Sequence, residues 1–190
     1  WKLGMAMNCE GLGQVHQLLG QEATAGELYR QAAVFFEQTG HLGRLALCCD
    51  RLGELLLRGQ NWEGACREFA RALELYEEVG NKADVARTAI NLGDAWFNAY
   101  PEQVGEAESL YLQGLEEYRR LPDQRGRGLA YIGLGNVALN RGEVSQAIAM
   151  WTAAQELFNQ SGNSEQSRQV ETALRQISAA GRMRSAQRIG

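Results

Sequence analysis

Apolar residues recur along the chain with the period of an α-helix. In the segment GACREFARALELYEEVG, residues 64–80, the apolar positions are Ala65, Phe69, Ala72, Leu73 and Tyr76. This spacing of four, three, one and three residues places all five side chains on one side of a helix. The sequence therefore predicts an amphipathic helix here.

The same text returns at a fixed distance along the chain. A Leu-Gly pair occurs at residues 12–13, 52–53, 92–93 and 134–135, so that successive pairs are 40, 40 and 42 residues apart. An aromatic residue follows each pair at a similar distance: Tyr29, Phe69, Tyr111 and Trp151. Self-similarity at such a period is the signature of a protein built from stacked repeats.

Glycine occupies two kinds of position in these repeats. One group follows the leucine of each pair in the middle of a predicted helix: Gly13, Gly53, Gly93 and Gly135. Glycine costs about 1 kcal/mol relative to alanine inside a helix, so we expect a neighbouring helix to pack too closely there for a side chain. A second group, Gly20, Gly59 and Gly142, is expected to end the first helix of a repeat with a positive φ.

The repeated text resembles the tetratricopeptide repeat (TPR). That motif has a Leu-Gly pair in its first helix (helix A), then a small residue, an aromatic residue and a second small residue in its second helix (helix B). The second repeat shows all of them as Leu52-Gly53, Ala65, Phe69 and Ala72. The resemblance covers essentially the whole chain. It implies an all-α fold, a right-handed TPR superhelix (α-α solenoid) of four helix-turn-helix repeats plus a C-terminal capping helix.

The period departs from the usual TPR length of about 34 residues. The longer period is similar to that of kinesin light chains and spindle-orientation adaptors, and to that of the TPR arrays of bacterial STAND-type regulators. The sequence does not choose between these two groups.

The repeats are expected at 1–39, 40–79, 80–121 and 122–161. Leu174 stands 40 residues after Leu134, but Arg175 replaces the glycine. We therefore expect residues 164–179 to form a lone capping helix, the whole TPR domain to span 1–179, and residues 180–190 to form a basic flexible tail. The chain is expected to be a module of a larger intracellular, cytoplasmic protein.

The resemblance also implies a binding groove on the concave side, lined by helices A. In TPR proteins the groove residues lie five and two positions before the leucine of the pair and two and five after it. In the first two repeats these are Met7, Glu10, Gln14, Gln17, Leu47, Asp50, Glu54 and Leu57. In the last two they are Arg87, Ile90, Asp94, Phe97, Leu129, Ile132, Asn136 and Leu139, with Asn91 and Asn140 as further polar anchors beside Arg87 and Asn136.

The composition of this set suggests the ligand. It holds more apolar side chains than a solvated face needs, which favours a partner. Glu10, Asp50, Glu54 and Asp94 make its first half acidic. We therefore expect a protein or peptide segment with apolar and basic residues. The open alternative is that a neighbouring copy, the rest of the parent protein or the basic tail covers the groove.

Other classes of function find little support in the sequence. The net charge of -4 gives no electrostatic case for nucleic acid or membrane surfaces. The four cysteines show no Cys-x-x-Cys pair, so we expect buried thiols and no metal site. Gly133-x-Gly135-x-x-Ala138 has the spacing of a dinucleotide-binding turn, but it is the fourth copy of the helix-packing pair. We expect no catalytic residues, no enzyme activity and no cofactor.

The sequence thus predicts a protein-protein interaction scaffold that binds a peptide or amphipathic segment in its concave groove. Two alternatives remain open. In the first, the chain is a sensor or regulatory domain of a STAND-type signalling or transcription regulator. In the second, it forms a homo-oligomer by stacking its repeats on those of another copy.

Overall fold

The computed structural model describes the backbone of residues 1–187 and the side chains of residues 1–179. This part of the chain forms nine α-helices and no strand. Their bounds are α1 Lys2–Leu18, α2 Glu22–Thr39, α3 Leu42–Arg58, α4 Trp62–Glu78, α5 Lys82–Ala99, α6 Val104–Arg119, α7 Gln124–Asn140, α8 Val144–Gln160 and α9 Ser164–Gln187. The prediction of an all-α solenoid is confirmed.

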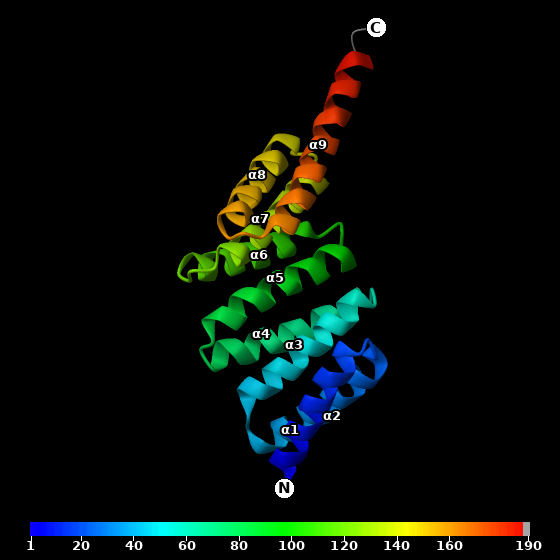
Figure 1. The fold of residues 1–190 in the computed structure, drawn as a ribbon, viewed down its shortest axis with the longest axis vertical. Helices are drawn as coiled ribbons and strands as arrows, with labels where there is room; N and C mark the ends of the chain where they lie inside the picture. The colour runs from blue at the N-terminus through cyan, green and yellow to red at the C-terminus, as the bar shows by residue number, and fades with distance from the viewer. Residues whose placement is uncertain (188–190) are drawn as a thin grey trace.

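The helices stack in chain order from one end of the molecule to the other (Figure 1). Each helix packs against the next, and the most extensive contacts are within the pairs α1–α2, α3–α4, α5–α6 and α7–α8. Helix α5 also contacts both α3 and α7, so that helices A lie side by side. The solenoid therefore has one side made of helices A and another made of helices B.

The Leu-Gly pairs mark the closest contacts within each helix pair. A Cβ atom added at Gly13, Gly53 or Gly93 would lie 2.9, 2.7 or 2.8 Å from the nearest ring atom of Tyr29, Phe69 or Tyr111, respectively. At Gly135 it would overlap the indole of Trp151. Glycine is therefore needed where the aromatic ring of helix B lies flat against helix A, as the sequence predicted.

Asparagine and aspartate start three of the helices. The side chains of Asn61, Asn81 and Asp123 each accept a hydrogen bond from a backbone N–H in the first turn of the helix that follows. Such N-caps satisfy one of the backbone donors that a helix start leaves free. The caps fix where α4, α5 and α7 begin.

The expectation for the turn glycines is correct at two of three positions. Gly20 and Gly142 have φ values of 72° and 79°. Gly59 does not, because its φ is -75° and the next residue, Gln60, takes the left-handed conformation with a φ of 59°. Gln60 stands eight residues after its leucine, as Gly20 and Gly142 do. The repeat register, and not the glycine itself, sets the conformation.

The last helix is longer than the sequence predicted. Its stripe Val170, Leu174 and Ile177 packs against Trp151 and Phe158 of α8. The helix continues to Gln187, past the expected end at residue 179. The segment from 165 to 187 has no proline and is rich in Ala, Gln and Arg, all tolerated well in helices. Residues 180–187 are thus helical rather than a flexible tail, and they extend away from the stack (Figure 1); residues 188–190 lie outside the described residues.

Candidate functional site

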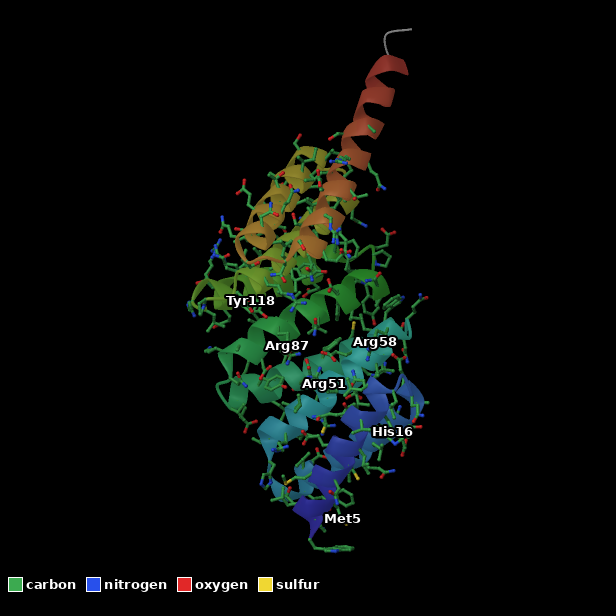
Figure 2. The ribbon with its side chains drawn as sticks, in the orientation of Figure 1. Met5, His16, Arg51, Arg58, Arg87 and Tyr118 are labelled. Carbon is green, nitrogen blue, oxygen red and sulfur yellow. The ribbon has the colours of Figure 1, made fainter. Side chains whose placement is uncertain are left out.

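Three hollows follow one another along the side of helices A. The first, of about 490 Å³, lies between α1 and α3 and is lined by Gln14, Gln17, Leu18, Tyr29, Arg51 and Arg58. The second, of about 210 Å³, is lined by Glu54, Leu57, Arg58 and Asn91 of α3 and α5. Figure 2 shows Arg51, Arg58 and Arg87 along this part of the stack. Both hollows include groove positions that the sequence singled out.

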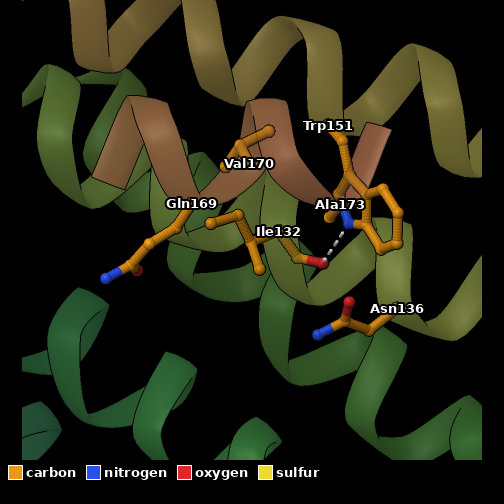
Figure 3. Close-up of a pocket in the computed structure, with 6 residues that line it drawn as sticks. All are labelled: Ile132, Asn136, Trp151, Gln169, Val170 and Ala173. Carbon is orange, nitrogen blue, oxygen red and sulfur yellow. Dashed lines mark hydrogen bonds between the residues drawn. The ribbon is translucent and has the colours of Figure 1, made fainter. Parts of the chain in front are cut away.

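The third hollow lies at the other end of the row, where α9 meets α7. It has a volume of about 200 Å³ and is lined by Ile132, Asn136, Trp151, Gln169, Val170 and Ala173 (Figure 3). The indole Nε1 of Trp151 donates a hydrogen bond of 3.3 Å to the carbonyl oxygen of Ile132. This bond holds the ring at the wall of the hollow. The result is an apolar cavity with two side-chain amides at its edge.

The amides on this side of the solenoid differ in how they are bonded. The side chains of Asn91 and Asn136 make no hydrogen bond to the rest of the described chain, although each lines a hollow. Gln169 donates a hydrogen bond of 3.1 Å to Glu165 on its own helix. An amide offers both donors and an acceptor. Asn91 and Asn136 can therefore pair with the backbone of a bound peptide without breaking an internal bond.

Three of the four acidic residues of the predicted groove form ion pairs with arginines of the protein. Glu10 is buried, and its Oε2 accepts a hydrogen bond of 2.8 Å from Arg44 Nη1. Glu54 accepts one of 2.8 Å from Arg51 and also lies 3.6 Å from Arg87. Arginine side chains therefore already neutralise the charges of both glutamates.

Asp50 is the most deeply buried of the acids. Its side chain is fully buried, and its two oxygens accept hydrogen bonds from Arg87 (2.6 Å) and Thr88 (2.9 Å). Arg87 also donates to Asp84 at 2.6 Å. Burial raises the pKa of Asp50 even though Arg87 favours its ionised form. The carboxylates around Arg87 raise the pKa of that guanidinium and outweigh the effect of burial. Arg87 is therefore a structural cation that ties α5 to α3, and not a free anchor.

Asp94 has a different environment. Its Oδ1 accepts a hydrogen bond of 2.7 Å from the hydroxyl of Tyr111, and no cation is paired with it in the described residues. Burial raises the pKa of Asp94 to about 6, and the bond from Tyr111 opposes this shift. Asp94 is therefore the acid of the predicted groove that no arginine neutralises within the described residues.

The apolar groove positions also divide by burial. Ile90 lies in the core, where it packs next to Gly114 of α6, so it does not line the groove. A substitution of Ile90 by a charged residue would therefore destabilise the fold, and it is unsuitable as a test of groove binding. The partly buried members of the set are Leu47, Leu57, Phe97, Leu129 and Ile132. The exposed apolar members are Met7 and Leu139, and the polar Gln14 and Asn140 are exposed as well.

Several solved structures have a fold similar to that of this chain. The crystal structure of BtubC (BKLC) from P. vanneervenii matches with a TM-score of 0.74 and 20% identity, over 83% of this chain and 64% of that one. Apo RapI matches with a TM-score of 0.81 and 15% identity, over 88% and 61%. A Rap protein complexed with Competence and Sporulation Factor matches with a TM-score of 0.77 and 16% identity, over 99% and 52%. The fold is a TPR-like helical repeat.

The TPR-like chain spans about half to two thirds of the length of these three structures. No protein-family model matches its sequence, and no curated protein is significantly similar to it. Among the described helices, none is both long and apolar enough to cross a bilayer.

The cysteines of the TPR-like fold belong to its packing. Cys48 and Cys49 are buried, and burial raises the pKa of each thiol to about 12. A thiol that stays protonated is a poor nucleophile and a poor metal ligand. His16 is half-buried and bonded to Gln21 through Nδ1, and not packed in the core.

Sequence reasoning missed one group of residues at this site. These residues are the basic row Arg44, Arg51 and Arg58, at intervals of seven along α3. Arg51 and Arg58 each directly follow a predicted groove position, and Arg44 stands three residues before the first groove position of this helix. That interval places the three side chains on one face of the helix. The spacing was visible in the sequence, and Arg51 pairs with Glu54 three residues later on the same helix. The pairing of Arg44 with Glu10 and of Arg58 with Glu22 joins different helices and depends on the tertiary structure.

Proposed function

We propose that the chain is a protein-interaction scaffold that binds a peptide or an amphipathic segment along the side of helices A. The observation that carries this proposal is the row of three hollows with the unbonded amides of Asn91 and Asn136 beside two of them. A hollow takes a side chain of a ligand, and an amide at its edge holds the backbone of the ligand.

The likeness to a Rap protein complexed with Competence and Sporulation Factor supports this assignment, because that protein has a similar fold and binds a partner. Since the chain spans only part of each similar structure, we propose that it acts as a module of a larger protein. A sensor or regulatory role in a STAND-type regulator, and a location in the cytoplasm, fit the same module and remain predictions.

The structure changes the ligand that we propose. An apolar segment fits the hollows lined by Leu57, Ile132 and Val170. The preference for basic residues is weakened in the first half of the groove, since Arg44, Arg51 and Arg87 already neutralise three of the four acids there. We therefore propose a ligand with two or more apolar side chains and low net charge.

A peptide selection tests the proposal. A displayed library of random 12-residue peptides is selected on the immobilised chain, and the affinity of enriched peptides is measured by fluorescence anisotropy. The variant Asn91→Ala with Asn136→Ala removes the two amides and leaves no internal donor or acceptor unpaired. We expect it to bind the peptides about tenfold more weakly, as two lost hydrogen bonds would dictate.

The matched control is Gln38→Ala with Gln146→Ala, two exposed amides on helices B. This control is expected to bind the peptides as the unchanged chain does. Either a selection that yields no saturable binder or equal affinity for both double variants would rule out the groove as the binding site.

A further inference from the structure

The outer face of α1 is apolar and uncovered, although the equivalents of its apolar residues in α3, α5 and α7 are buried. Leu12 is 51% exposed, whereas the leucines at the equivalent position, Leu52, Leu92 and Leu134, are at most 9% exposed. Val15 is 50% exposed, and its equivalents Leu55, Ala95 and Val137 are buried. In α3, α5 and α7 this face is covered by helix B of the preceding repeat.

Helix α1 also repeats a feature of α7 in detail. Gly4 and Gly11 stand at the positions of Gly126 and Gly133, 122 residues later. A Cβ atom added at Gly126 or Gly133 would overlap the ring of Tyr118 or Tyr111 of α6. An added Cβ at Gly4 or Gly11 has no neighbour within 4 Å. At these positions α3 and α5 carry larger polar residues: Arg44, Arg51, Asp84 and Asn91. The two glycines of α1 thus leave space for two rings, and nothing in the described chain fills it.

Each helix B carries the feature that fits such a face. Two aromatic residues stand seven positions apart in all four, namely Tyr29 and Phe36, Phe69 and Tyr76, Tyr111 and Tyr118, and Trp151 and Phe158. All eight are buried. An interval of seven places both rings on one side of a helix, two turns apart. In α6 the pair fills the space left by the two glycines of α7.

We propose that the outer face of α1 docks an amphipathic helix from outside these 190 residues, and that this helix carries two aromatic side chains seven residues apart. The face continues the interface that the chain itself forms between α2 and α3, α4 and α5, and α6 and α7. The two charged residues of α1, Lys2 and Glu10, lie off the apolar positions, and Glu10 is buried on the groove side by Arg44. The side of the docked helix that faces α1 is therefore uncharged as well as aromatic.

A second copy of the chain does not supply this helix. The aromatic pairs of all four helices B are already buried in the stack. At the far end, the apolar side of α9 is used against α8, and its other side carries the ion pairs Arg168–Glu165 and Arg175–Glu171. A charged end of this kind terminates a solenoid. Among the side chains that the structure describes, the two ends therefore differ and offer no matching surfaces for end-to-end stacking of copies.

The test uses α6 itself as the probe. A fluorescent peptide with the sequence of residues 103–121 is cross-linked between positions 112 and 116, both exposed in α6, to hold it helical. We expect saturable binding to the unchanged chain by fluorescence anisotropy. The chain variant Gly4→Leu with Gly11→Leu fills the space for the rings and favours the helical state of α1. It is expected to keep its melting temperature and to bind the peptide at least tenfold more weakly.

Two controls separate this proposal from the groove. The same peptide with Tyr111→Ala and Tyr118→Ala is expected to lose binding, because it lacks both rings. The chain variant Asn91→Ala with Asn136→Ala is expected to bind the unchanged peptide normally. The absence of saturable binding, or equal binding by the Gly4→Leu, Gly11→Leu variant, would overturn the proposal. So would sedimentation that shows a dimer of the chain dissociated by that variant, since the occupant would then be a second copy.

Discussion

Gln60 holds a backbone conformation that glycine holds at the equivalent turns. Its φ of 59° lies in the left-handed region, which costs a residue with a side chain about 1 kcal/mol or more. Gly20 and Gly142 occupy the same place after α1 and α7. The turn therefore tolerates an unfavourable residue because the helix pair around it fixes the geometry.

We expect Gln60→Gly to raise the free energy of unfolding by about 1 kcal/mol, because the strain at this residue is relieved. Urea denaturation followed by circular dichroism measures the change. The reverse substitution, Gly20→Gln, should lower stability by a similar amount. Equal stability of Gln60→Gly and the unchanged chain would show that the turn is not strained.

Asp94 gives the stability of the protein a specific pH dependence. Its pKa in the folded chain, about 6, lies above its ordinary value of 3.8. The fold therefore favours the protonated form, and the stability associated with that form is fully present below pH 3.8 and is lost as the pH rises through 6. Ionised Asp94 costs at most about 3 kcal/mol at neutral pH.

We expect Asp94→Asn to stabilise the chain, since asparagine still accepts the hydrogen bond from Tyr111 without carrying a charge. The gain should be up to about 3 kcal/mol at pH 7.5 and about half of that at pH 5. Urea titrations at the two pH values measure the difference. A gain that is equal at both pH values would contradict the raised pKa.

At the scale of elements, one buried network connects consecutive helices A. Asp50 of α3 is held by Arg87 and Thr88 of α5, and Arg87 in turn binds Asp84 on its own helix. Breaking such a pair from one side leaves a buried charge without its partner, which costs far more than replacing both members with apolar residues.

We expect Arg87→Leu to lower the free energy of unfolding by about 3 kcal/mol, because Asp50 stays buried with only Thr88 to bond it. The double variant Asp50→Leu with Arg87→Leu should lose less than the single variant. Thermal and urea unfolding of the two single variants and the double variant give the coupling energy. Additive losses would show that the two side chains do not depend on each other.

At the scale of the whole molecule, the solenoid presents two separate surfaces. One is the row of hollows along helices A, and the other is the apolar end face of α1. The groove is formed by several repeats together, whereas the end face belongs to one helix. The two binding experiments proposed above therefore report on different parts of the chain, and each has a variant that leaves the other surface unchanged.

The sequence predicted most of the fold because the residues that pack the two helices of a repeat against each other lie within that repeat. The Leu-Gly pair, the aromatic residue of helix B and the small residues around it recur four times, and the structure places each glycine against the aromatic residue of its own repeat. The prediction was less exact where no repeat supplied a second copy. The end of α9 is an example, since local helix propensity decided it. The conformation of Gly59 was mispredicted for another reason, because the position in the repeat and not the residue type decides which residue of the turn has a positive φ.

The sequence by itself determined the helical repeats, their order and the row of positions along helices A, because these depend on periodicity within single helices. Only the tertiary structure decided which of those positions a ligand can reach. Glu10 and Asp50 are buried and ion-paired because the neighbouring helix A brings an arginine that lies 34 or 37 residues away in the sequence. Ile90 is buried because it packs against α6. Burial and charge pairing are properties of several helices at once, so no single repeat could show them.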